Sequence, residues 1–139
     1  MFKKKIKYTD YNGEVREETF YFNLNKAELM EMEYSKEGGL SAALRRIVEE
    51  KSKPKLWHAF KDILLAAYGE KSEDGKRFIK SKELSEAFAQ TEAYNNLFLE
   101  LCSQEEGLGW VKFITEIIPE DMRGEIPPDI QEKLTNNVA

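Results

Sequence analysis

The stretch YGEKSEDGKRFIKSKELSEAFAQTEAYNNLFLEL, residues 68–101, decides the fold of this chain. It starts with a polar segment in which Asp74-Gly75 predicts a tight turn, with a small hairpin as one form of it. Ser81 and Thr91 follow at positions typical of helix N-caps, so a short amphipathic helix is expected after each. The stretch therefore predicts a folded helical unit, and it contains no motif of reaction chemistry.

Upstream of this unit, residues 2–9 and 14–23 alternate apolar and polar side chains, which predicts two strands. Asp10 and Gly13 between them suit a type I turn followed by a left-handed residue. This three-residue loop sets a register that keeps the apolar set together, whereas a two-residue loop would split it. The expected pairs on the apolar face are Phe2–Phe22, Lys4–Phe20, Ile6–Glu18 and Tyr8–Arg16. The other, solvated face is expected to pair Lys3–Tyr21, Lys5–Thr19 and Lys7–Glu17.

Several further helices are predicted by capping signals and apolar stripes. Asn25 with Glu28 resembles a capping box and starts a helix to about residue 34, with Ala27, Leu29 and Met30 facing inward. A soft binding surface formed by Met30 and Met32 is the alternative to a core position for Met30. Apolar stripes predict more helices at about 40–51, 54–68 and 108–118, and Gly69 is expected as the C′ residue of the second.

The predicted class is α+β and mostly α. An N-terminal β-hairpin (2–23) packs on a bundle of about five to six short helices (about 25–118), in one domain of residues 1–118. Residues 119–139 contain three prolines, scattered charge and few apolar anchors. They predict a flexible, disordered C-terminal tail.

The composition, 41% hydrophobic and 34% charged over 139 residues, is that of one globular domain. No apolar run approaches the ~20 residues that span a bilayer, and MFKKKIKY lacks the apolar core of a signal peptide. One cysteine excludes an intrachain disulfide, so a cytosolic protein is expected. The net charge of −5 argues against nucleic acid. The four lysines near the N-terminus could form a nucleic-acid patch, but a solvated strand face explains them better.

Candidate catalytic residues lack partners in the sequence. His58 has no signalled nucleophile or orienting group, and a position on a helix surface is favoured. Cys102 has no CxxC partner, and a buried structural role is favoured. One histidine and one cysteine do not make a metal site, and no phosphate-binding glycine loop is present. We therefore expect no enzyme activity, no metal and no cofactor.

The helix predicted at about 54–68 is the most apolar and is expected to be central. In the last predicted helix, at about 108–118, apolar side chains cover more than one side, which is more than a lone surface helix needs. One interpretation is that all of these side chains are interior. The other is that some form an interface, either for self-association or for an amphipathic partner helix. Under the second interpretation, the hypothesised partner-binding residues are Trp110, Phe113, Ile114 and Ile117, with the hairpin edge as a further surface.

Two stretches together, YTDYNGEVREETFYFNLNKAELMEME (residues 8–33) and residues 68–101, resemble the tail assembly chaperones of long-tailed, siphovirus-type phages and prophages of Gram-positive bacteria. The likeness extends over about residues 3–118. Its most specific part is RFIKSKELSEAFAQTEAY, because helix physics does not demand that order of residues.

This resemblance implies a late phage protein that acts in the bacterial cytoplasm. Such chaperones bind the tape measure protein, keep it soluble, hand it over to tail tube subunits, and are absent from the mature virion. Many are made in two lengths through a ribosomal frameshift. The implied partners are the tape measure and tail tube proteins, with homo-oligomerisation left open. The alternative is a structural minor tail or tail-terminator protein that is retained in the virion.

Overall fold

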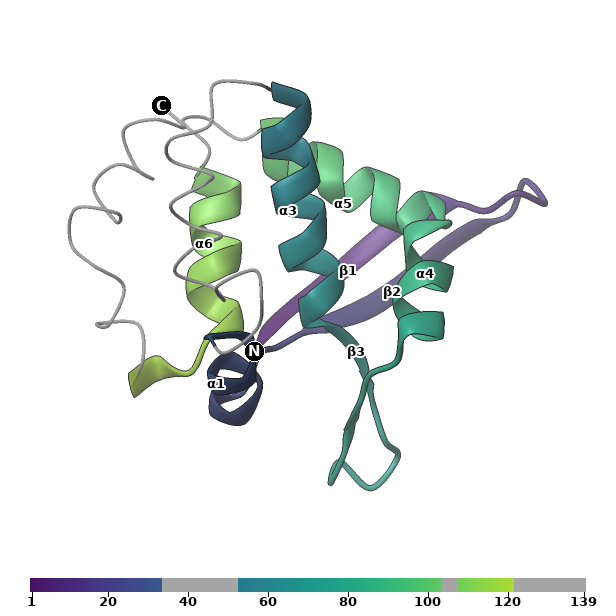
Figure 1. The fold of residues 1–139 in the computed structure, drawn as a ribbon. Coiled ribbons are helices and arrows are strands. Elements are labelled where there is room, and N and C mark those ends of the chain that lie inside the picture. The colour runs from purple at the N-terminus through teal and green to yellow at the C-terminus, as the bar shows by residue number, and fades with distance from the viewer. Residues whose placement is uncertain (34–52, 104–107, 122–139) are drawn as a thin grey trace.

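The computed structural model describes residues 1–33, 53–103 and 108–121. Within these ranges the chain forms one four-stranded antiparallel sheet and five helices, so the predicted α+β, mostly helical class is confirmed (Figure 1). The predicted helix at 40–51 and most of the predicted tail lie outside the described residues. In chain order the elements are β1 (Phe2–Thr9), β2 (Val15–Phe22), α1 (Lys26–Glu33), α3 (Lys53–Ala67), β3 (Tyr68–Lys71), β4 (Phe78–Ile79), α4 (Lys82–Ala89), α5 (Glu92–Ser103) and α6 (Leu108–Ile117).

The N-terminal hairpin has the predicted turn and register. The Gly13 amide donates to the Asp10 carbonyl at 3.0 Å, and the Asp10 amide donates to the Glu14 carbonyl at 2.8 Å. Gly13 has a φ of +83°, the left-handed conformation that this loop requires. All seven predicted strand pairs are present, from Phe2–Phe22 to Tyr8–Arg16. The turn of the β1–β2 hairpin projects beyond the helices that lie along its strands (Figure 1).

The Asp10 side chain explains why this turn is well defined. Its carboxylate accepts hydrogen bonds from the amides of Asn12 and Glu14, at 2.9 and 3.0 Å, and pairs with the Arg16 guanidinium at 2.6 Å. The Arg16 side chain, then the Glu14 amide, hold the pKa of Asp10 below its ordinary value. Asp10 therefore stabilises the turn through two backbone amides and also forms an ion pair with Arg16 at the start of the second strand.

A second hairpin joins the first in one sheet. Asp74-Gly75 forms the expected tight turn, with a φ of +75° at Gly75, and it places β4 beside β3. Strand β3 also pairs with β2, through Tyr21–Gly69 and Phe22–Tyr68, which gives the strand order β1-β2-β3-β4. The sequence contained no signal for this pairing between β2 and β3, because it joins segments that are far apart along the chain.

The prediction that Gly69 caps α3 is wrong. The helix ends at Ala67, and Gly69 lies inside β3. A side chain there is excluded by packing, since a Cβ atom on Gly69 would lie 2.6 Å from Cε2 of Phe78. Gly69 thus lets the Phe78 ring lie against the sheet.

Local side chains cap three helices as predicted. Asn25 and Glu28 form a reciprocal capping box, with amide-to-side-chain distances of 2.8 and 3.0 Å. The Ser81 hydroxyl accepts the Leu84 amide at 3.0 Å, and the Thr91 hydroxyl accepts the Tyr94 amide at 3.1 Å. Within α1, however, the expectation that Ala27 and Met30 face inward is wrong. Both are exposed, whereas Leu29 is buried and Met32 packs against the core.

The core lies between the helices and one face of the sheet. Phe22 is fully buried at its centre. Aromatic rings from four other elements surround it with centroids 5.5 to 5.9 Å away, namely Phe2, Tyr68, Phe88 and Phe113. Helices α4 and α6 therefore pack on the apolar face of the hairpin.

The close approach at Gly69 gives a stability prediction. Gly69→Ala is expected to lower the free energy of unfolding by about 1–3 kcal/mol, because the new methyl group overlaps the Phe78 ring. Urea denaturation of four proteins, the wild type, Gly69→Ala, Phe78→Ala and the double variant, measures the coupling. If Gly69→Ala costs as much without the Phe78 ring as with it, the explanation is wrong.

Candidate partner-binding surfaces

Helix α6 packs into the core. The four side chains predicted to bind a partner, Trp110, Phe113, Ile114 and Ile117, are 2%, 0%, 2% and 0% exposed. Trp110 stacks on Phe60 of α3 at 4.2 Å, and its indole N–H donates to the Cys102 Sγ at 3.3 Å. The apolar excess of this helix follows from its position, because it contacts α3, α5 and the sheet. In the folded chain a partner reaches these side chains only if α6 moves away, and a binding role for them stays a prediction.

Large apolar side chains are exposed elsewhere, at positions spread over several elements. In the described part of the chain they are Met1, Tyr11, Val15, Met30, Trp57 and Leu99. Trp57 continues the stripe of α3 that is buried at Phe60, Leu64 and Ala67, yet it is 47% exposed. Trp57 lies in the helix predicted at about 54–68, and periodicity alone does not show which apolar positions of a helix are covered by another element. Leu99 on α5 is 57% exposed, and no pattern in the sequence indicated this exposure.

The candidate chemical residues lie apart from one another. His58 is on the exposed side of α3, with Nε2 3.6 Å from the Asp62 carboxylate one turn later. Cys102 is exposed, so its predicted burial is wrong. Cys102 follows the buried Leu101 on α5, and one position along a helix turns a side chain by about 100° away from the buried one. Its sulfur still accepts the indole N–H of Trp110.

Tyr68 lies in the core and stacks on Phe88 with ring centroids 4.2 Å apart. Burial, and then the nearby Glu70 carboxylate, raise the pKa of Tyr68 to about 12. Its hydroxyl therefore stays protonated at neutral pH, and the side chain acts as a core aromatic with a polar end.

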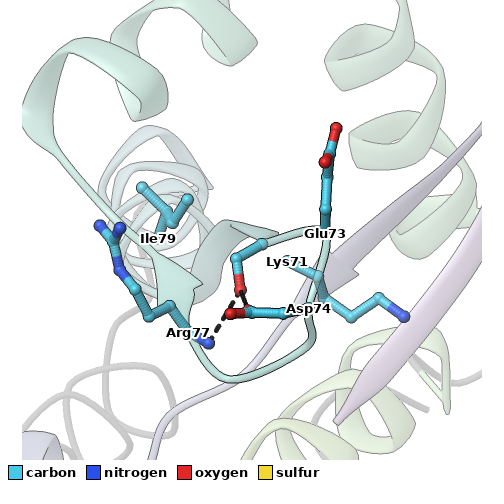
Figure 2. A pocket seen from close by; sticks show the side chains of 6 residues that line it. Lys71, Glu73, Asp74, Arg77 and Ile79 are labelled. Atoms are coloured by element: carbon cyan, nitrogen blue, oxygen red, sulfur yellow. Dashed lines mark hydrogen bonds between the residues drawn. The ribbon is translucent and has the colours of Figure 1, made fainter.

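A hollow beside the β3–β4 turn is lined mostly by polar side chains (Figure 2). Its lining residues are Lys71, Ser72, Glu73, Asp74, Arg77 and Ile79. The polar atoms serve the turn itself, because the Ser72 hydroxyl donates to Asp74 at 2.7 Å and accepts the Arg77 amide at 3.0 Å. Among residues 1–33, 53–103 and 108–121, no three or more metal-ligating side chains come together.

The described part of the chain thus has an α+β fold with a dense aromatic core and several separate apolar side chains on its surface. A family model described as phage tail assembly chaperone matches residues 1–137. The chain therefore belongs to the phage tail assembly chaperone family. The match also includes most of residues 119–139, for which the sequence gave no resemblance.

Other comparisons add no relative. Comparison with curated proteins finds no match, and comparison with solved structures finds none. Among the described helices, none combines the length and apolarity that a membrane crossing requires.

The buried position of α6 predicts a large effect on folding. Ile114→Ala is expected to lower the free energy of unfolding by about 2–5 kcal/mol, because it leaves a cavity in a packed core. Trp57→Ala is the matched control at an exposed apolar position and is expected to cost far less. Thermal and urea denaturation measure both. Equal, small losses would show that α6 is not part of the core in solution.

Proposed function

We propose that this protein binds the tape measure protein of its phage in the bacterial cytoplasm, keeps it soluble, and hands it over to tail tube subunits. The family match over residues 1–137 is the observation that carries this proposal. The protein is proposed to act by binding, without turnover, and to be absent from the mature virion.

Exposed apolar side chains support a binding role. A tape measure protein is long, helical and apolar, so a chaperone has to cover apolar stripes. Trp57 and Leu99 are about half exposed on two of the helices. Burial of such surface is worth about 25 cal/mol per Å², less the cost of ordering the partners. We therefore propose Trp57 and Leu99 as the first contacts to test.

The four side chains of α6 are the second surface to test. A direct contact through Trp110 or Ile114 requires the helix to leave the core, where α3, α5 and β1 enclose it. Such opening costs the burial of these side chains, so the partner would have to replace it with equivalent apolar contacts. A contact through the exposed Trp57 has no such cost and is favoured for this reason.

Modest affinity per copy fits the proposed handover. Several copies on one long partner can act together, since binding at neighbouring sites gives avidity without any single strong contact. Tail tube subunits that polymerise around the tape measure protein then displace the copies one at a time. A surface of a few exposed apolar residues, instead of one deep groove, suits this reversible covering.

Co-expression tests the proposal. The tape measure protein encoded with this chain is expected to be insoluble alone and soluble with the wild type, as measured by centrifugation of the lysate. The double variant Trp57→Ser with Leu99→Ser is expected to reduce the soluble fraction several-fold. Met30→Ser is the matched control, because Met30 is 61% exposed on α1 and lies outside the proposed contacts.

Two results would contradict the proposal. One is a tape measure protein that stays insoluble when the wild-type chain is present and folded. The other is this chain found by mass spectrometry as a stoichiometric component of purified particles, which would favour the structural minor tail or tail-terminator alternative. A loss of solubility with Met30→Ser as large as with the double variant would overturn only the choice of surface.

A further inference from the structure

One face of the sheet is turned away from the described helices, which pack on the face that carries Phe2, Ile6 and Phe22. Side chains alternate along a strand, so the residues next to the buried set point to the opposite face. This open face is defined by residues from all four strands, Lys3, Lys5, Lys7, Glu17, Thr19, Tyr21, Lys71 and Phe78. Most of these side chains are exposed, and Thr19, Tyr21 and Phe78 are half-buried.

The open face is positively charged in an acidic protein. It carries four lysines and one glutamate, a formal charge of +3, whereas the whole chain carries −5. The Glu17 carboxylate forms an ion pair with the Lys5 ammonium at 2.9 Å. Lys3 and Lys71 have no acidic partner within ion-pair distance in the described residues. The positive charge of this face is therefore available to a ligand.

Two aromatic rings lie among these lysines. The Lys71 ammonium lies 4.6 Å from the centre of the Tyr21 ring. The Phe78 ring covers the bare backbone of Gly69, which pairs with Tyr21 across the strands. Lys80 lies 5.7 Å from the Phe78 ring centre, but Glu28 and the Asn23 carbonyl hold its ammonium at 2.5 Å. The aromatic rings are thus half-exposed and flanked by exposed lysines.

We infer that the open face binds an acidic, amphipathic segment of a protein partner. Carboxylates of that segment would pair with Lys3, Lys7 and Lys71, and its apolar side chains would cover Tyr21 and Phe78. Under the proposed function this partner is the tape measure protein, and the inference rests on that proposal. Charge complementarity selects the occupant, since opposite charges steer and orient association.

Two other occupants fit the charges less well. A second copy that paired along β1 would bring its own Lys3, Lys5 and Lys7 toward the same lysines, and like charges at that distance repel. A nucleic acid would meet the lysines, but it would also meet the negative field of the rest of the chain. An acidic protein segment can contact this face alone.

A charge-reversal experiment tests the inference. The variant Lys3→Glu with Lys71→Glu is compared with Lys82→Glu with Lys112→Glu, which makes the same charge change on α4 and α6, at exposed positions outside this face and on helices that carry neither Trp57 nor Leu99. Affinity for the co-expressed, purified tape measure protein is measured at low and high salt. The open-face variant is expected to bind about tenfold more weakly at low salt, and the difference should shrink at high salt. The control variant should bind like the wild type.

Each contrary result has a distinct meaning. If both variants bind like the wild type, the open face is not the docking surface, and the proposed function stands. If the wild type itself does not bind, the proposed function fails, and this occupant fails with it. Binding of a duplex DNA fragment that depends on the open-face lysines would also overturn the inference. So would self-association, measured by sedimentation, that the open-face variant abolishes while it still binds the tape measure protein. Lys3→Gln with Lys71→Gln replaces the reversal variant if circular dichroism shows that the latter is unfolded.

Discussion

The burial of the Phe22 ring is the interaction on which the rest of this structure depends. Rings from β1, β3, α4 and α6 surround it, so the sheet and the helices meet at this one side chain. Its place is fixed by the register of the first hairpin, because a slip of one residue would move it to the open face. The turn at Asp10 and Gly13 therefore determines which face of the sheet receives the helices and which face is left to the lysines.

Local features of this fold could be predicted from the sequence, and contacts between distant segments could not. The register, the Asn25–Glu28 capping box and the Ser81 cap follow from residues a few positions apart, and all are present. The pairing of β2 with β3 joins Phe22 with Tyr68 and Tyr21 with Gly69, which are 46 and 48 positions apart. This pairing makes Gly69 a strand residue under the Phe78 ring instead of a helix cap. No short-range pattern in the sequence carries that information.

The candidate surface was harder to predict for a related reason. The apolar excess of α6 suggested an interface, yet Trp110 and its neighbours fill the core. Periodicity shows that a helix has an apolar side, but not whether another element covers it. Trp57 shows the opposite case, a residue in a buried stripe that remains half exposed. Lys3, Lys5 and Lys7 of the open face alternate along the first strand in the sequence, but the aromatic residues of this face come together only through the β2–β3 pairing.

These observations support a chaperone that keeps its own core closed while exposed residues cover its partner. Hydrogen exchange of the chain, with and without bound tape measure protein, tests this claim most directly. The account predicts that the amides of α6 stay as protected in the complex as in the free chain, while protection rises around Trp57 and along the open face. Loss of protection throughout α6 on binding, with no change at those two surfaces, would contradict it.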